Sequence, residues 1–223
     1  MIEPREKLSA TQVRDAGLVD WRQILGRIKA RFRTGDFRTG LALVDKIGAA
    51  AEAADHHPDI HLSYSDVIVT LASHDVRGIT SRDLDLARQI SSHAAELGID
   101  SDASGLTQLE LGVDTALGSQ LAPFYAALLG GKVENGEPVD ASGQVPTVWW
   151  QASDGDQTWA LPEQPFEQRW HFDVWVAHDE GERRLKAVLD AGGRLVSDRA
   201  APAYWVVEDA DGNRSCICTP AGR

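Results

Sequence analysis

The chain has little cysteine. Only two of its 223 residues are cysteine, Cys216 and Cys218, and they stand two apart near the C-terminal end. On a strand, residues at this spacing point to the same face, which makes a disulfide between them unfavourable. The cysteine content therefore gives no indication of an oxidising compartment.

Long apolar runs are also absent. No stretch approaches the roughly 20 apolar residues that a membrane-spanning helix needs. The first residues, Met-Ile-Glu-Pro-Arg-Glu-Lys, lack the apolar centre of a signal peptide. We therefore expect a cytoplasmic protein that does not interact with the membrane.

Basic residues are few, since 22 Lys and Arg stand against 34 Asp and Glu, for a net charge of −12. An acidic chain without a basic stripe is a poor candidate for nucleic-acid binding. The charge is also unevenly spread. Residues 1–100 hold 13 basic and 15 acidic residues, whereas residues 101–223 hold 9 and 19. This step in charge near residue 100 suggests two domains.

The first hundred residues alternate between strand and helix patterns. Alternating apolar and polar residues predict strands, and apolar residues three and four apart predict helices. In chain order they predict two short strands within 21–37, a helix over 38–54, strands over 60–65 and 67–72, and a helix over 81–97. If the alternation of the strand over 67–72 continues, His74 lies on the same strand face as Ile68 and Thr70. The order predicts an α+β fold in which helices cover an antiparallel sheet.

Three histidines gather around the predicted end of the first long helix. His56 and His57 are adjacent, Pro58 ends the helix, and His74 follows a strand's length later. Glu52 and His56 are four apart, so both can project from one helical face. Imidazole exchanges protons readily near neutral pH, which suits an acid–base site. The pattern alone leaves an alternative equally open, in which His56 and His57 cap a helix and His74 fills a strand edge.

Residues 99–106 are small, polar and aperiodic, which predicts a linker between domains at 1–98 and 107–223. Beyond it, the order strand–helix–three strands occurs twice. The first copy is predicted at 109–113, 120–129, 132–134, 146–151 and 159–161, and the second at 171–176, 180–191, 194–196, 204–207 and 215–219. This internal repeat predicts paired βαβββ units.

The stretch from Trp21 to Leu97 resembles pterin-4a-carbinolamine dehydratases. The match is carried by Trp21, Asp36-Phe37, Glu52, Asp55-His56-His57-Pro58-Asp59, Leu71 to Asp75, Gly78 and Thr80 to Ala87. The resemblance implies a four-stranded antiparallel sheet with helices on one face, and a dimer or tetramer. It also implies a hydro-lyase that converts 4a-hydroxytetrahydropterin to quinonoid dihydropterin and water with no metal or organic cofactor.

The same resemblance assigns roles to individual residues. One group must protonate the leaving hydroxyl while another takes the N5 proton, and two imidazoles suit this exchange. The implied acid–base pair is His56 and His74, and His57 would hold the pterin. The implied substrate-binding residues are Glu52, which would orient or charge-balance a histidine, Trp21 as a pocket wall, Pro58, and Asp83. The stretch from Thr80 to Asp83 also fits a capping box at the start of a helix, so Asp83 is equally explained as a helix cap. His61 and His93 lie outside the motif and are expected at the surface.

The second domain resembles the vicinal-oxygen-chelate superfamily, of the glyoxalase and bleomycin-resistance type. The markers are Phe124 to Gly131, His171 to Val176, Leu189 to Gly193 and Glu208 to Asn213. Metal-using members carry ligands on four strands, where His171 and Glu110 could serve here. Cys216 and Cys218 stand where the last strand usually has Glu, so we expect a metal-free pocket.

Six tryptophans lie in the second domain, at 149, 150, 159, 170, 175 and 205. They either line a cup that binds a flat ligand or form a core or interface.

Two competing functions remain beside the dehydratase. One is a non-catalytic protein that binds a pterin or small aromatic molecule or serves as a dimerisation module. The other is a glyoxalase-like lyase or dioxygenase centred on the second domain.

Overall fold

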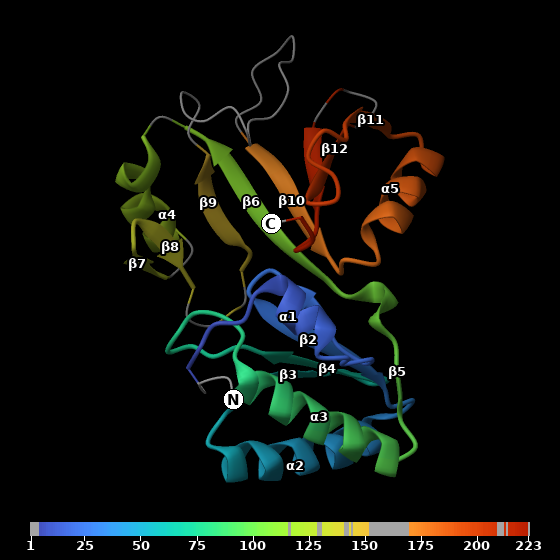
Figure 1. Cartoon of the computed structure of the whole chain (residues 1–223). Coiled ribbons are helices and arrows are strands. Elements are labelled where there is room, and N and C mark those ends of the chain that lie inside the picture. Colours follow the sequence, from blue (N-terminus) through green and yellow to red (C-terminus); the bar gives the residue numbers. More distant parts are fainter. Residues whose placement is uncertain are drawn as a thin grey trace. The chain divides into compact units, whose positions relative to one another are not determined.

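The computed structural model describes residues 5–115, 117–128, 131–140, 143, 145–151, 170–208, 212 and 214–222. The chain divides into two compact units, Met1–Leu106 and Thr107–Gly222. Each unit has its own sheet and helices (Figure 1). No helix in the described ranges is both long and apolar enough to cross a membrane.

The first unit is built on an antiparallel sheet, as the sequence predicts. Its strands are β1 (Arg22–Ile24), β2 (Arg27–Arg33), β3 (Asp59–Leu62) and β4 (Asp66–Leu71), in the spatial order β1-β2-β4-β3. The two-residue strand β5 (Asp100–Ser101) pairs with β2, and a short 3₁₀ helix, η1 (Ala103–Gly105), follows it. The segment between the predicted domains therefore contributes to the first sheet.

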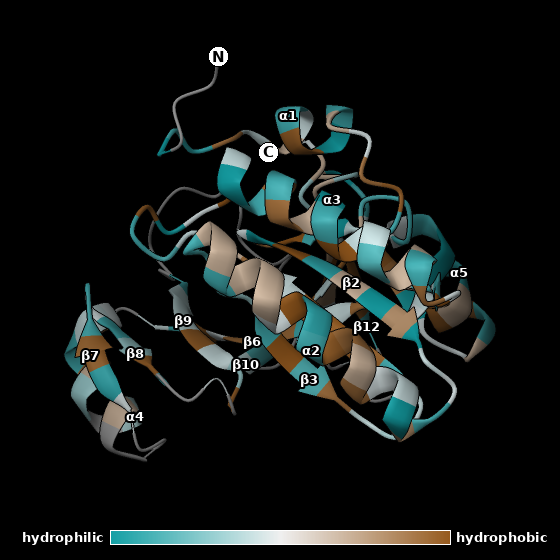
Figure 2. Cartoon of the chain, turned by 90° about the horizontal axis from the view of Figure 1, so that it is seen from below, coloured by the Kyte–Doolittle hydropathy of each residue, from teal (hydrophilic) through white to brown (hydrophobic). Residues whose placement is uncertain are grey.

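Three helices complete the first unit: α1 (Ala10–Asp15), α2 (Phe37–Ala54) and α3 (Ser81–Glu96). The long helices α2 and α3 lie side by side on one face of the sheet (Figure 1). Hydrophilic and hydrophobic residues alternate along both ribbons (Figure 2), as expected for amphipathic helices. The buried core between sheet and helices includes Ile28, Ala30, Phe32, Leu43, Ile47, Leu86 and Ile90.

His74 does not lie on β4, so its predicted place on that strand is wrong. The strand ends at Leu71, and the chain then forms a tight loop closed by backbone pairing of Ser73 with Gly78. Ser73 N–H donates to the Gly78 carbonyl at 2.8 Å, and Gly78 N–H donates back at 3.3 Å. Arg77 takes the left-handed conformation, with φ of 50°, that this turn requires. His74 is an exposed residue at the start of the loop.

The second unit contains the predicted order of strand, helix and three strands twice. The first copy is β6 (Thr107–Asp114), η2 (Gly118–Leu121) leading into α4 (Ala122–Leu128), β7 (Lys132–Glu134), β8 (Glu137–Val139) and β9 (Thr147–Gln151). The second is β10 (Trp170–Val176), α5 (Gly181–Asp190), β11 (Arg194–Ser197), β12 (Tyr204–Glu208) and β13 (Arg214–Cys218). The sequence did not predict β8, and the strand predicted at 159–161 lies outside the described residues.

These strands form a mixed six-stranded sheet in the order β11-β12-β13-β10-β6-β9, while β7 and β8 form a separate hairpin. In the centre, β10 runs antiparallel to β6 and parallel to β13. One face packs against α5 through a small apolar core of Val176, Trp205, Val207 and Ile217, with Leu185 and Val188 from the helix. Because side chains alternate along each strand, the neighbouring positions His171, Asp173 and Cys216 lie on the opposite face.

Candidate active site

His56 is turned into the first unit by the way α2 ends. Asp55 takes the left-handed conformation (φ 46°, ψ 42°) just after the last helical residue. The chain therefore reverses, and His56 N–H donates to the Ala51 carbonyl at 3.1 Å. Pro58 then keeps the chain extended as it enters β3. As a result His56 is buried, with 7% of its surface exposed, while His57 beside it points outward.

The partner of His56 is Asp83, a fully buried carboxylate in the first turn of α3. One carboxylate oxygen, Oδ1, lies 2.7 Å from His56 Nε2. The other, Oδ2, accepts hydrogen bonds from the Thr80 backbone N–H at 2.7 Å and the Ser73 hydroxyl at 2.8 Å. The Thr80 bond completes the predicted capping box. Asp83 is thus a helix cap that also contacts a histidine of the motif.

This contact fixes the orientation of the imidazole. A carboxylate accepts hydrogen bonds, so we assign the Nε2–H of His56 as the donor to Asp83. The nitrogen that remains to take up or release a proton is then Nδ1. A buried carboxylate that holds one tautomer of a histidine is a recurrent arrangement in acid–base sites.

His57 and Glu52 form a second pair on the outside of the helix end. His57 Nε2 lies 3.2 Å from Glu52 Oε1, and both side chains are more than half exposed. Such an exposed pair contributes little to stability. Both side chains are therefore accessible to a ligand next to the point where His56 enters the interior.

His74 is tied to the same carboxylate through its loop. The hydroxyl of Ser73, its neighbour, donates to Asp83, which itself contacts His56. The loop is also held by Arg82, whose guanidinium donates to Asp75 at 2.6 Å. No hydrogen bond joins His56 and His74 directly within the described ranges. Asp83 nevertheless links the loop of one histidine to the ring of the other.

The Arg82–Asp75 bond provides a first prediction. The hydrogen bond from Arg82 holds the pKa of the Asp75 carboxyl below its ordinary value. The ion pair therefore contributes fully to stability at pH values above the ordinary pKa, and this contribution is lost as the pH falls through the lowered pKa. In Arg82→Ala the Asp75 titration should move up, and the His74 amide signal should begin to shift at a higher pH. An NMR pH titration measures both. Arg88→Ala, which removes an exposed Asp85 partner on the same helix, should leave them unchanged, and an unchanged titration in Arg82→Ala would contradict the anchoring role.

Trp21 was predicted to form a wall of the pterin pocket, but its contacts are those of a core residue. It is buried in the core, its indole N–H donates to the Ser91 hydroxyl at 3.1 Å, and its ring meets Phe32 edge to face. None of these contacts involves the three histidines of the motif. Packing between α3 and β2 accounts for this tryptophan. His61 is exposed on β3, as expected, and His93 is partly exposed beside Glu96.

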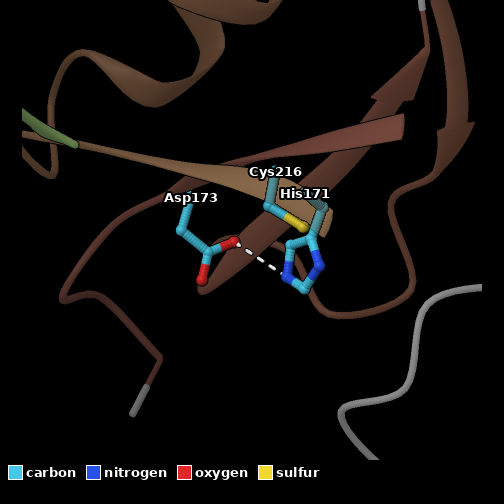
Figure 3. Close-up of side chains that lie close together, drawn as sticks. All are labelled: His171, Asp173 and Cys216. Carbon is cyan, nitrogen blue, oxygen red and sulfur yellow. Dashed lines mark ion pairs between the residues drawn. The ribbon is translucent and has the colours of Figure 1, made fainter. Parts of the chain in front are cut away.

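A second group of potential ligands lies in the other unit. His171 and Asp173 on β10 and Cys216 on β13 converge, with one donor atom from each within 4.8 Å of the others (Figure 3). Glu110, which the sequence offered as a ligand, instead accepts a hydrogen bond from the Trp175 indole at 2.9 Å. Asp173 was missed, although its place two residues after His171 on a strand was a visible signal.

Hydrogen bonding and burial raise the pKa values of two groups near His171, the Cys216 thiol and the Asp114 carboxyl. The pKa of the Cys216 thiol is raised well above its ordinary value, first by its hydrogen bond with Cys218 and then by burial. Burial also raises the pKa of Asp114, whose carboxylate lies 3.9 Å from His171 Nδ1. Because its pKa is raised, the thiol stays protonated at neutral pH and is a poor nucleophile.

The five described tryptophans of the second unit lie in three environments. Trp150 and Trp170 both pack on Tyr125, with ring centroids 5.6 Å apart in each case. Trp149 meets the His171 ring edge to face. Trp175 and Trp205 are buried, and Trp159 lies outside the described residues. An aromatic ring therefore borders the His171 group.

The fold and these contacts define the class of protein. It has an α+β domain that contains a buried histidine–carboxylate pair, followed by a paired βαβββ domain. The family model for pterin 4 alpha carbinolamine dehydratase matches residues 6–93, and the model for a glyoxalase-like domain matches residues 110–218. The chain belongs to the pterin-4a-carbinolamine dehydratase family through its first unit and carries a glyoxalase-like domain in its second.

Two individual relatives, from Thermosynechococcus vestitus and Nocardia farcinica, support the first assignment. Proteins of Thermosynechococcus vestitus and Nocardia farcinica, each named "Putative pterin-4-alpha-carbinolamine dehydratase", are 41% and 42% identical over 91 residues. Each alignment covers 40% of this chain and 96% of the relative. Among solved structures, a transcriptional coactivator/pterin dehydratase from Brucella melitensis is 30% identical, covering 40% of this chain and 99% of that one with a TM-score of 0.39.

Proposed function

We propose that the first unit is a hydro-lyase that dehydrates 4a-hydroxytetrahydropterin to quinonoid dihydropterin and water. The C4a–O bond breaks as the leaving hydroxyl receives a proton, the N5–H bond gives up its proton, and a C4a=N5 double bond forms. The reaction is redox-neutral, since one proton is delivered and one is removed. The protein therefore has to supply one proton donor and one acceptor, and it has to hold the pterin between them.

The observation that carries this proposal is the buried His56–Asp83 pair. A histidine that only capped a helix would not need a buried carboxylate at 2.7 Å from its Nε2. Fixing that nitrogen as a donor leaves Nδ1 for proton exchange with the substrate. His74, in the loop attached to Asp83 through Ser73, is the second member of the pair. Exposure suits it for exchanging its proton with solvent between turnovers.

The exposed residues at the end of α2 would bind the substrate. His57 and Glu52 offer a ring N–H and a carboxylate, which match the carbonyl and the amino and amide N–H groups on the edge of a pterin. Pro58 is half-buried beside them and gives the chain a fixed bend. Trp21 is left out of this set because its contacts are those of a core residue.

We further propose that the protein forms a homo-oligomer, a dimer or tetramer. Strand β3 is an edge of the first sheet, with β4 on one side and no strand on the other within the described residues. An open strand edge can pair with the same edge of a second copy.

His74→Ala tests the assignment of the second histidine. We expect the dehydration rate to fall by roughly 10²-fold or more, because a positioned acid or base contributes about that much. Stability should change little, since His74 is exposed. His61→Ala is the matched control: it also removes an exposed histidine of the first unit, and it should keep the wild-type rate. If both variants have the wild-type rate, His74 takes no part in the reaction.

A further inference from the structure

Ser73 is a buried polar residue at the base of the loop that carries His74. It is 1% exposed, and its backbone closes the loop by pairing with Gly78. Its hydroxyl oxygen lies 2.8 Å from Asp83 Oδ2 and 2.8 Å from the Thr80 hydroxyl oxygen. One residue therefore belongs both to the loop of His74 and to the surroundings of the carboxylate that contacts His56.

The hydrogen bonds around Ser73 can be given a direction. A hydroxyl has one proton to donate and a carboxylate only accepts, so Ser73 donates to Asp83. The Thr80 hydroxyl then donates to Ser73, and its oxygen accepts from the Arg82 backbone N–H at 3.2 Å. The Thr80 hydroxyl also lies 3.3 Å from Oδ2, which is a longer contact. The result is a chain of donors that ends at Asp83 Oδ2, while His56 donates to Oδ1.

The capping box of α3 does not need the Ser73 hydroxyl. Asp83 fills its part of the box by accepting from the Thr80 backbone N–H at 2.7 Å. A single donor leaves the carboxylate able to turn about its last torsion, which in aspartate has a broad range. A second donor on a separate segment fixes the plane of the carboxylate and therefore the direction of Oδ1, which meets His56 Nε2 at 2.7 Å.

We infer that Ser73 is a positioning residue for the pair of His56 and His74. Its hydroxyl aims the Asp83 carboxylate at His56, and its backbone attaches the His74 loop to the same carboxylate. The inference rests on the proposed dehydration, because it assigns Ser73 a part in that reaction. Ser73 acts through Asp83 and exchanges no proton with the substrate, so its loss should weaken catalysis less than the loss of His56.

Ser73→Ala is expected to lower kcat for dehydration by about 10-fold, less than the roughly 10²-fold that a 1 Å misplacement can cost. KM should stay near its wild-type value, because the hydroxyl holds Asp83 and not the pterin. Ser91→Ala is the matched control. It also removes a serine hydroxyl from the first unit, one that accepts from the Trp21 indole, and it should keep the wild-type kcat. Steady-state kinetics on the full-length protein measure both parameters.

Ser73→Thr and Ser73→Val separate the hydroxyl from the shape of the side chain. Threonine and valine have nearly the same shape, and both suit the β-bridge position that Ser73 occupies. Only threonine can donate to Asp83. We expect Ser73→Thr to keep most of the wild-type kcat and Ser73→Val to lose as much as Ser73→Ala. Equal kcat values in the threonine and valine variants would overturn the inference, even if Ser73→Ala did not fold.

Proton NMR of the His56 ring gives a readout that does not depend on turnover. In the wild type, the hydrogen bond to the buried carboxylate should slow the exchange of the Nε2 proton with water and move its resonance downfield. His56→Gln lacks this proton and so assigns the resonance. Ser73→Ala and Ser73→Val should move the resonance upfield and speed its exchange, whereas Ser91→Ala should leave it unchanged.

The two readouts separate failure of this inference from failure of the proposed function. An active wild type whose kcat and Nε2 resonance are unchanged in Ser73→Ala and Ser73→Val would overturn the positioning role and leave the dehydratase intact. A wild type no faster than buffer would contradict the dehydration itself, and the part of Ser73 in that reaction would fall with it. A lower kcat together with a shifted resonance, in only the variants that lack the hydroxyl, is the result that we expect.

Discussion

A His56→Ala variant is expected to lose about 10²- to 10⁴-fold of the dehydration rate, the range typical of a general acid or base. The reason is the fixed geometry of the ring, whose Nε2 is held by Asp83 and whose Nδ1 is free to exchange a proton. The effect should appear mainly in kcat, because proton transfer belongs to the chemical step. Steady-state kinetics on purified full-length protein measure it.

His56→Gln separates proton transfer from packing. The glutamine amide can still donate a hydrogen bond to Asp83 from near the position of Nε2, but it cannot exchange a proton at neutral pH. We expect His56→Gln to fold almost as stably as the wild type and to be nearly as inactive as His56→Ala. In His56→Ala, by contrast, a buried acceptor loses its donor, at a stability cost of about 1–3 kcal/mol. Wild-type activity in His56→Gln would show that the ring serves structure alone.

Asp83→Asn is expected to have the largest combined effect on stability and activity. The carboxylate accepts from Thr80, Ser73 and His56, and an amide replaces one of its acceptor oxygens with a donor. We expect a loss of about 2–4 kcal/mol in unfolding free energy, because buried donors lose a charged acceptor and the capping box of α3, whose N-cap residue is Thr80, is weakened. The rate should also fall by at least about 10-fold, since His56 is no longer held in one tautomer.

Asp85→Asn is the control for this prediction. Asp85 lies on the same helix two residues later, is exposed, and pairs with Arg88 at the surface. Its replacement should change stability by less than about 0.5 kcal/mol. Urea unfolding of both variants provides the comparison. A double-mutant cycle of Asp83→Asn with His56→Gln should give a coupling energy of about 1 kcal/mol or more, and additive effects would mean that the two residues act separately.

The helices were predictable because their signals are local. Apolar spacing placed α2 within one residue of its observed start, and Thr80 to Asp83 identified the beginning of α3 through a capping box. The contact between His56 and Asp83 was not predictable in the same way. The two residues are 27 apart in sequence and meet only because the end of α2 lies beside the start of α3. His74 was misplaced because the loop that carries it is closed by pairing of Ser73 with Gly78, which interrupts the strand alternation.

In the second unit, too, the order of elements was predictable from the sequence, whereas contacts between distant residues were not. Its repeated order of elements was visible in the sequence, whereas the short strand β8 was missed because its three residues, Glu137–Val139, include a proline and show no clear alternation. The neighbourhood of Asp173 and Cys216 depends on the parallel pairing of β10 with β13. Register between strands separated by a helix and two further strands does not follow from a periodic pattern.

The most direct test of the central claim is the initial rate at which catalytic amounts of the full-length protein convert 4a-hydroxytetrahydropterin to quinonoid dihydropterin. It is measured against buffer and against the His56→Ala/His74→Ala double variant. We predict a rate for the wild type that rises in proportion to protein concentration, and a double variant close to buffer. A wild-type rate equal to that of buffer would contradict catalysis by this unit, and a fully active double variant would contradict the histidine pair.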